Sequence, residues 1–173
     1  MIFQENRRLL SSGNDNSLAS MDHNVKWMQR AFELAQKAKE YDEVPVGAVI
    51  VHEDKIIGEG WNQPISSHDP TAHAEIIALR IAGSNVGNYR LPGATMYVTL
   101  EPCAMCAGAI VHARLSKLIF AVADPKTGAC GSIFNLLQTE ELNHKVEIDK
   151  SIMEDECRAL IQTFFKEKRL KPS

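Results

Sequence analysis

The sequence predicts a layered α/β domain with a largely parallel sheet. Apolar runs of strand length alternate along the chain with segments whose apolar residues recur at helical spacing, which is the pattern of a sheet covered by helices. The chain has 173 residues, of which 45% are hydrophobic and 24% are charged, as in an ordinary globular protein with one core. We therefore expect residues 21–173 to form a single domain.

The N-terminal segment, residues 1–20, is polar, rich in Ser and Asn, and without periodicity. We expect this segment to be disordered. A first helix is predicted after it, because apolar residues recur there at helical spacing. These residues are Val25, Met28, Phe32 and Ala35.

A hairpin of two strands is predicted next. Residues 44–51 form a continuous apolar run that contains one Gly and one Pro, which favours a buried strand. Glu53-Asp54-Lys55 then makes a polar turn that leads into a second strand at Ile56-Ile57.

Helices and strands alternate along the middle of the chain. Asp69-Pro70-Thr71 has the composition of a helix start, and we expect this helix to end at Gly83. Residues 95–100 are rich in β-branched side chains and predict a strand. A helix is predicted over residues 103–113, and a strand buried on both faces over residues 118–122.

The C-terminal part begins with a loop over residues 124–132 that is rich in Gly, Pro and Lys. Residues 146–148 predict a short edge strand. A last helix is indicated by a single apolar stripe at helical spacing. The stripe consists of Cys157, Leu160, Ile161, Phe164 and Phe165.

We expect a cytoplasmic protein. No stretch approaches the roughly 20 apolar residues of a membrane helix, and the first ten residues lack the apolar centre of a signal peptide. We therefore expect no membrane partner, and we expect the C-x-x-C pair to serve metal or redox chemistry rather than disulfides. The formal net charge of -3 argues against non-specific nucleic-acid binding but leaves room for a local basic face.

Two short motifs carry the candidate chemistry. His73-Ala74-Glu75 supplies an imidazole and a carboxylate, and Pro102-Cys103-Ala104-Met105-Cys106 supplies two thiolates. One His and two Cys ligands leave the fourth position of a tetrahedral zinc open for water, as a catalytic site requires. The combination matches the H-x-E and P-C-x-x-C signature of zinc-dependent nucleobase deaminases.

The spacing of these motifs predicts how they meet. Cys103 and Cys106 are three residues apart, so on a helix they share one face. His73 and Glu75 are two residues apart and can reach one site only near the start of their helix. We infer that two helix N-termini converge on one metal. A closed structural zinc, with His112 or Cys130 as the fourth ligand, and a thioredoxin-type redox pair are the weaker alternatives.

Longer segments resemble the bacterial tRNA-specific adenosine deaminases, a branch of the cytidine and deoxycytidylate deaminase superfamily. The resemblance covers roughly Trp27 to Arg169. It is carried by residues 44–51, 58–62, 68–75, 97–103 and 124–128, together with Gly131-Ser132.

The resemblance implies a three-layer α/β/α cytidine-deaminase-like fold around a mixed, mainly parallel five-stranded sheet. It further implies a homodimer with one zinc ion per subunit. The implied activity is zinc-dependent hydrolytic deamination of adenosine to inosine, with release of ammonia, at the wobble position of a tRNA anticodon. The implied partner is the anticodon stem-loop of the arginine tRNA that carries a wobble adenosine.

Residue roles also follow from the resemblance. His73, Cys103 and Cys106 would hold zinc, and Glu75 would be the catalytic proton shuttle. Asn62 would hydrogen-bond the flipped base, and Asp124 would lie near the anticodon loop. Ala74, Lys126 and Phe165 complete the predicted substrate-binding set. A wider basic face for phosphates is expected from Arg90, Lys126, Lys166, Lys168, Arg169 and Lys171.

Two other functions compete with this one. A metabolic deaminase of the same fold, acting on a free base such as guanine or cytosine, would share the zinc motifs, although the Asp124 loop and the basic tail favour RNA. A non-catalytic RNA-binding or structural zinc module would have no use for Glu75 or for an open coordination position.

Overall fold

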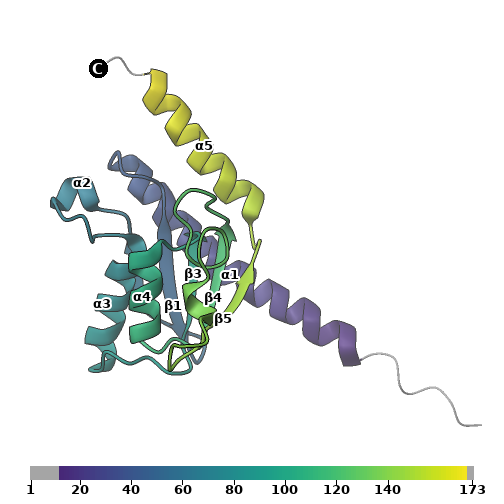
Figure 1. Cartoon of the computed structure of the whole chain (residues 1–173). Helices are drawn as coiled ribbons and strands as arrows, with labels where there is room; N and C mark the ends of the chain where they lie inside the picture. The colour runs from purple at the N-terminus through teal and green to yellow at the C-terminus, as the bar shows by residue number, and fades with distance from the viewer. Residues whose placement is uncertain (1–11, 171–173) are drawn as a thin grey trace, which may run out of the picture.

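The computed structural model describes residues 12–170 of the chain. The expected alternation of helices and strands is confirmed in these residues (Figure 1). The elements are α1 (Ser12–Glu40), β1 (Gly47–His52), β2 (Lys55–Trp61), α2 (Pro64–Ser67), α3 (Ala74–Val86), β3 (Thr95–Leu100), α4 (Ala104–His112), β4 (Lys117–Val122), the 3-10 helix η1 (Leu136–Gln138), β5 (Glu147–Lys150) and α5 (Glu154–Leu170).

The strands of the described chain form one mixed five-stranded sheet in the order β2-β1-β3-β4-β5. Strand β1 is antiparallel to both of its neighbours, β2 and β3. The pairs β3–β4 and β4–β5 are parallel. The predicted mixed sheet is therefore confirmed, and its parallel half is the β3–β4–β5 side.

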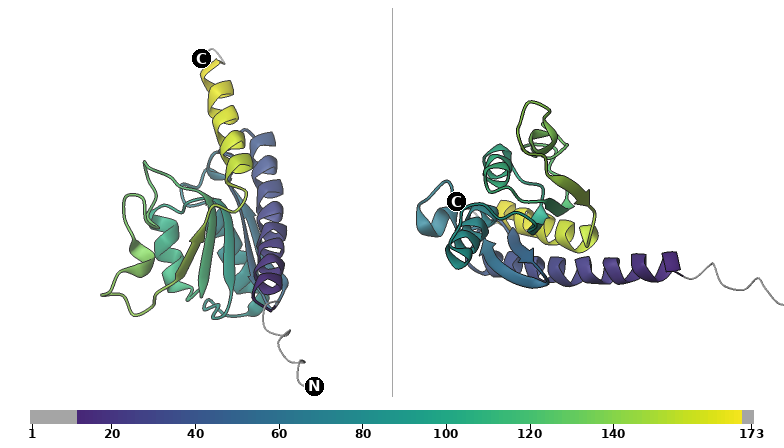
Figure 2. Two further views of the ribbon diagram at one scale, coloured as in Figure 1. Left: turned by 90° about the vertical axis from the view of Figure 1, so that its right-hand side faces the viewer. Right: turned by 90° about the horizontal axis from the view of Figure 1, so that it is seen from below.

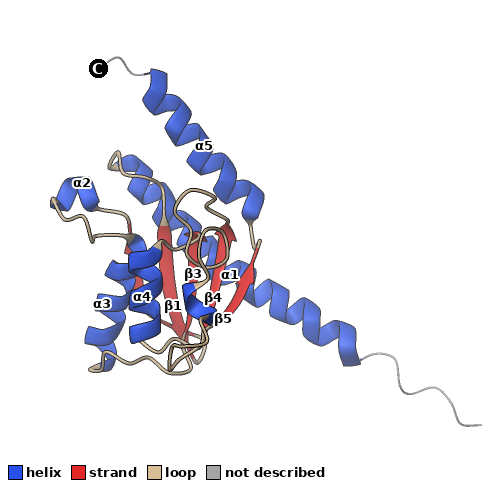
Figure 3. Cartoon of the chain, in the orientation of Figure 1, coloured by secondary structure: helices blue, strands red, loops and turns tan. Residues whose placement is uncertain are grey.

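Helices cover both faces of the sheet (Figures 2 and 3). Consecutive residues of a strand point to opposite faces, and the two cores follow this alternation. Val98 packs in the core under α3 and α4, whereas Tyr97 packs in the core under α1 and α5. Phe120 and Ile119 of β4 divide in the same way. The structure is therefore the expected three-layer α/β/α arrangement.

Two glycines bring α3 against the backbone of the edge strand β2. A Cβ atom at Gly60 would lie 2.2 Å from the carbonyl oxygen of Ala74, and one at Gly58 would lie 2.3 Å from that of Ala78. No side chain fits in such a space, so only glycine permits this close approach. The N-terminal turn of α3 is therefore placed by contact between main chains.

Helix α1 begins earlier than the sequence predicted. It starts at Ser12 and runs without a break into the packed part of the helix, so the expectation of disorder is wrong for residues 12–20. Residues 1–11 lie outside the described part of the chain. Adding residues to an existing helix is much cheaper than nucleating one, which explains how a polar segment without periodicity can be helical here.

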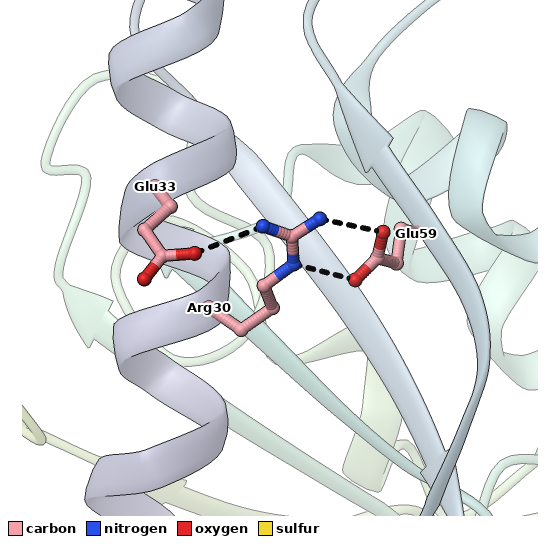
Figure 4. Close-up of polar contacts among 3 residues, drawn as sticks. All are labelled: Arg30, Glu33 and Glu59. Atoms are coloured by element: carbon pink, nitrogen blue, oxygen red, sulfur yellow. Dashed lines mark hydrogen bonds and ion pairs between the residues drawn. The ribbon is translucent and has the colours of Figure 1, made fainter.

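A partly buried ion pair fastens α1 to the edge strand β2 (Figure 4). The Arg30 guanidinium donates to both carboxylate oxygens of Glu59, with N–O distances of 2.7 and 3.0 Å. It also donates to Glu33, one helical turn further along α1, at 2.9 Å. Two-pronged Arg–carboxylate contacts of this kind fix orientation as well as distance.

Helix α3 is shifted along the chain relative to its prediction. It begins at Ala74 rather than near Thr71, because the Asp69 side chain accepts hydrogen bonds from the amide and hydroxyl of Thr71 and holds that segment in a turn. It continues through Gly83 and ends at Val86, where Gly87 adopts a left-handed conformation with φ of 70°. Glycine is the usual residue for such a helix end.

Some features differ only slightly from the sequence predictions, and two were not predicted. Strand β3 has the predicted bounds, and β5 begins one residue later than expected. The four-residue helix α2 and the short η1 were not anticipated, because neither is long enough to show a periodic pattern. Within residues 12–170, no helix combines the length and the apolar character that crossing a membrane requires.

Candidate zinc and substrate site

The three candidate zinc ligands lie at the starts of two neighbouring helices. His73 is the residue that precedes α3, and Cys103 is the residue that precedes α4, both with extended backbone conformations. Cys106 follows in the first turn of α4. The predicted convergence of two helix N-termini is confirmed, since the ligand atoms of these three residues lie within 4.8 Å of one another.

The spacing of the ligand atoms fits a tetrahedral zinc. The Nδ1 atom of His73 lies 3.7 Å from the Cys103 Sγ and 3.5 Å from the Cys106 Sγ. Zinc–nitrogen and zinc–sulfur bonds of ordinary length at tetrahedral angles place the nitrogen and sulfur about 3.6 Å apart. The residues present therefore suit zinc without rearrangement.

The metal group has three protein members in the described part of the chain. Cys130 is buried near the carbonyl oxygen of Pro102 and is not part of the group. His112 lies at the far end of α4, in a groove between α3 and α4. A closed structural zinc site would need a fourth protein ligand, and neither of these residues supplies it.

The thiols of Cys103 and Cys106 shift each other's pKa in opposite directions. The hydrogen bond from Cys106 lowers the pKa of Cys103 to about 4. The same contact, together with burial, raises the pKa of Cys106. Zinc binding requires both thiolates, so it would displace the Cys106 proton and make metal affinity depend on pH.

Glu75 lies in the first turn of α3, and its side chain is buried. Burial raises the pKa of this carboxyl to about 7. A group that must first accept and then donate a proton works best when its pKa is near the operating pH. Glu75 therefore has the environment of a general base that later acts as a general acid.

Glu75, His73 and Cys103 open onto one cavity of about 490 Å³. The surface of its wall is mainly apolar and comes largely from strand ends and from α5, although about half of the lining residues are polar. The remaining lining residues are Val44, Val46, Asn62, Pro64, Leu100, Glu101, Val122, Ala123, Asp124, Pro125, Lys126, Thr127, Arg158, Ile161, Gln162 and Phe165. A flat heterocyclic base suits such a cavity, in which apolar walls hold the ring and a few polar groups orient it.

Asn62 lies on the cavity wall, directly after β2. Its Oδ1 accepts a hydrogen bond from the Ala74 amide at 2.9 Å, which fixes the side chain against the start of α3. Ala74 does not line the cavity, because its side chain packs in the core and its amide is donated to Asn62. The Ala74 amide thus fixes the orientation of the Asn62 side chain.

Asp124 and Lys126 lie on the loop at the cavity rim. The Asp124 carboxylate accepts hydrogen bonds from the amides of Lys126 and Thr127 and from the Thr127 hydroxyl, at 2.9, 3.3 and 2.6 Å. Three of its interactions therefore stabilise its own turn. The Lys126 side chain is exposed beside the cavity.

The aromatic pair on α5 divides between two roles. Phe164 is buried, whereas Phe165 is 43% exposed and lines the cavity. The ring centroids are 5.4 Å apart in an edge-to-face arrangement. Phe165 therefore lies at the rim of the cavity, with its ring against that of Phe164.

The wider basic face is less continuous than predicted. Arg90 stacks on Tyr89 beyond the C-terminal end of α3, opposite to the end that carries His73. Lys168 forms an ion pair with Asp42, and Lys171 lies outside the described residues. Arg158 was not predicted, yet it lines the cavity from α5. The available signal in the sequence was its position beside the apolar stripe of the last helix, three residues before Ile161.

Glu101 was also missed by the sequence analysis. It is 3% exposed and lines the cavity directly before Pro102. An acidic residue between a buried strand and a metal-binding motif is unusual, because burial of a carboxylate is costly without hydrogen-bond donors. The position of Glu101 in the sequence was therefore the available sign that this residue has a specific role.

The comparisons with known proteins agree with this geometry. The family model of the cytidine and deoxycytidylate deaminase zinc-binding region matches residues 21–122. The tRNA-specific adenosine deaminase of Haemophilus influenzae is 49% identical over 156 residues, which cover 90% of this chain and 90% of that protein. The tRNA-specific adenosine deaminase of Bacillus subtilis is 43% identical over 151 residues, which cover 87% of this chain and 94% of that protein.

Solved structures show the same likeness. A structure from biochemical and structural studies of A-to-I editing by tRNA:A34 deaminases at the wobble position has a TM-score of 0.76 and 40% identity, covering 78% of this chain and 98% of that one. A guanine deaminase from Nitrosomonas europaea has a TM-score of 0.71 at 22% identity, covering 81% of this chain and 83% of that one. The second likeness shows the fold alone.

Proposed function

We propose a function on the premise that this chain belongs to the cytidine and deoxycytidylate deaminase family, in the branch of the tRNA-specific adenosine deaminases. It is a zinc-dependent enzyme that hydrolyses adenosine to inosine at the wobble position of a tRNA anticodon and releases ammonia. The deaminase chemistry rests on the group of His73, Cys103 and Cys106 at two helix starts, with buried Glu75 opening onto the same cavity. The choice of a tRNA rather than a free base rests on the 49% identity with a tRNA-specific adenosine deaminase.

The metal contributes one kind of chemistry. His73, Cys103 and Cys106 would hold a zinc ion, which would supply an activated water as nucleophile, because a bound metal lowers the pKa of water towards about 7.

Glu75 moves the protons of the reaction. Its carboxylate takes the proton of the attacking water and delivers it to the ring nitrogen beside the reacting carbon, which makes that carbon electrophilic. The same carboxylate then takes the proton of the hydroxyl group that has been added to the carbon and passes it to the amine. The carbonyl forms as the carbon–nitrogen bond breaks, ammonia leaves, and Glu75 returns to its starting state. One carboxyl can serve as base and acid in turn because its pKa, about 7, is near neutral pH.

The remaining residues orient the base. We assign Asn62 to a hydrogen bond with the edge of the flipped base, because the Ala74 amide holds its side chain on the cavity wall. Phe165 is assigned to stacking on an unpaired anticodon base, and Lys126 to a phosphate at the rim. Anticodon loops present splayed bases, so extracting one costs less than flipping a base from a duplex.

We further propose that the enzyme is a cytoplasmic homodimer that acts on an arginine tRNA with a wobble adenosine. The groove between α3 and α4, about 690 Å³ in volume, supports the dimer. It is lined largely by apolar groups, among them Ile76, Leu79 and Ala109, and Tyr89, which also lines it, is 67% exposed. A second copy of the chain would cover these groups. Sedimentation equilibrium tests this directly, and a monomer at micromolar concentration would contradict it.

The central test is inosine formation on a synthetic anticodon stem-loop with a wobble adenosine. Wild type should convert it, and Glu75→Ala should not, while keeping one zinc per chain. Ammonia release from free guanine or cytosine is measured in parallel, because a free-base deaminase would act there and leave the stem-loop unchanged. Inosine formation by Glu75→Ala at the wild-type rate would refute the role of Glu75.

A further inference from the structure

A buried carboxylate with no role in the proposed chemistry lies at the base of the cavity rim. Glu101 is 3% exposed, and among residues 12–170 it forms no ion pair with Lys, Arg or His. It accepts four hydrogen bonds instead. A buried carboxylate is stable without a cation only when donors surround it.

All four donors belong to one loop, residues 124–132. One carboxylate oxygen, Oε2, accepts from the Asp124 amide at 2.9 Å and from the Ser132 hydroxyl. The other, Oε1, accepts from the amides of Cys130 and Ser132, both at 3.0 Å. A single side chain therefore holds both ends of the loop.

The middle of the loop is fitted to the same side chain. A Cβ atom at Gly128 would lie 2.4 Å from the Cδ and 2.5 Å from Oε2 of Glu101. Gly128 also forms a backbone bridge with Cys103, and the Ala129 amide donates to the Pro102 carbonyl at 2.9 Å. The loop is thus closed around Glu101 and against the start of α4.

This loop carries part of the polar rim of the cavity. Asp124, Lys126 and Thr127 all line the cavity, and the turn that presents them begins at the amide held by Glu101. We propose that Glu101 is a positioning residue for substrate binding, whose carboxylate sets the loop 124–132 in the conformation that receives the anticodon loop. This inference rests on the proposed function for its substrate.

Replacement of Glu101 by Gln should remove the acceptor from one end of the loop and not from the other. The amide group can direct its oxygen to the Cys130 and Ser132 amides and its nitrogen to the Ser132 hydroxyl, which is able to accept. In that orientation only the Asp124 amide loses its acceptor. In the opposite orientation, the amides of Cys130 and Ser132 would both lose theirs. Glu101→Gln should therefore release the Asp124 end of the loop first.

The experiment compares Glu101→Gln, Gly128→Ala and the double variant with Thr99→Val as a matched control. Thr99 is equally buried, and its hydroxyl oxygen accepts from the Gly47 amide at 3.2 Å, outside the loop. Zinc content, hydrogen exchange of residues 124–132, and kcat and KM on the anticodon stem-loop are measured for each protein.

We expect Glu101→Gln to keep one zinc per chain, to lose exchange protection in the loop and to raise KM about tenfold with kcat changed by less than about threefold. Gly128→Ala should do the same, and the double variant should be less than additive, because both changes act through one contact. Thr99→Val should lower stability and leave KM unchanged.

A Glu101→Gln protein whose KM matches that of Thr99→Val would overturn the proposal, as would loss of zinc or of kcat at unchanged KM. The exchange measurement does not depend on activity, so intact protection of the loop in Glu101→Gln would also overturn it. Failure of wild type itself to form inosine would refute the proposed function instead.

Discussion

The two ends of the catalytic cavity are built in different ways. At the zinc end, the ligands come from two short motifs at the starts of α3 and α4, and the side chains are buried or half-buried. At the outer rim, Lys126 comes from the loop 124–132, whereas Arg158 and Phe165 come from α5. The chemistry thus depends on local spacing, and substrate recognition depends on how distant segments pack. Changes at the zinc end should affect kcat, and changes at the rim should affect KM.

The largest effect is expected for Glu75→Gln. The amide cannot exchange protons, so kcat should fall at least about 10³-fold while zinc is retained. The unfolding temperature should stay the same or rise, because a buried carboxyl with a pKa raised to about 7 is replaced by a neutral group. The checks are inosine formation, zinc content and a thermal melt, with exposed Glu140→Gln as the control. A marked loss of zinc would assign Glu75 to the metal site.

A large effect is also expected for Cys106→Ser. Loss of one thiolate should remove zinc on dialysis against a chelator, and activity should disappear with the metal. Cys157→Ser is the matched control, since Cys157 is equally buried but packs in the core under α1 and α5. It should keep one zinc per chain by elemental analysis. Full metal content in Cys106→Ser would contradict its role as a ligand.

A moderate effect is expected for Arg158→Ala. In the structure, Arg158 pairs with Glu154 one turn earlier on α5, and such exposed pairs contribute only a few tenths of a kcal/mol. The guanidinium is thus available to an RNA phosphate. KM for the stem-loop should rise about three- to tenfold with kcat unchanged. The slope of log affinity against log salt concentration should become shallower by about one unit, the change expected for the loss of one phosphate contact.

Lys55→Ala is the control for Arg158→Ala. Lys55 is exposed at the β1–β2 turn, at the opposite end of β2 from Asn62. It should leave KM and the salt dependence unchanged. Equal salt dependence for Arg158→Ala and wild type would show that Arg158 does not contact phosphate.

The smallest effect is expected far from the cavity, at Arg30. Arg30→Met breaks the two-pronged contact with Glu59, which is partly open to solvent, so the free energy of unfolding should fall by only about 0.5–1 kcal/mol. In a chain of this size, the unfolding temperature should fall by roughly 1–4 °C. Both kcat and KM should match wild type. A change in either would show that the α1–β2 contact influences the site.

The sequence was sufficient for the zinc end because local spacing limits its geometry. Residues two apart, such as His73 and Glu75, can face one metal only at a helix start, and the structure has them there. Strand β3 was equally clear, since its β-branched run has sharp ends. In both cases the determining interactions are close in sequence.

The rim was not predictable in the same way. Glu101 accepts from amides 23 to 31 residues away, and no periodic pattern marks such contacts. Asp124 was predicted to lie near the anticodon loop, but its carboxylate also accepts hydrogen bonds from Lys126 and Thr127 in its own turn. The early start of α1 depends on the part of the helix that is packed further along the chain. Local composition therefore favoured disorder for residues 12–20, which are helical in the structure.

The close approach of α3 to Gly58 and Gly60 has a consequence for how this enzyme can diverge. Because the main chain of β2 lies against the main chain of α3 there, substitutions of the surrounding side chains should move Glu75 very little. Selection for a new nucleic-acid substrate can therefore act on the rim while the reaction itself is inherited intact. Directed-evolution libraries should spare these two glycines and concentrate on the loop 124–132 and the cavity side of α5.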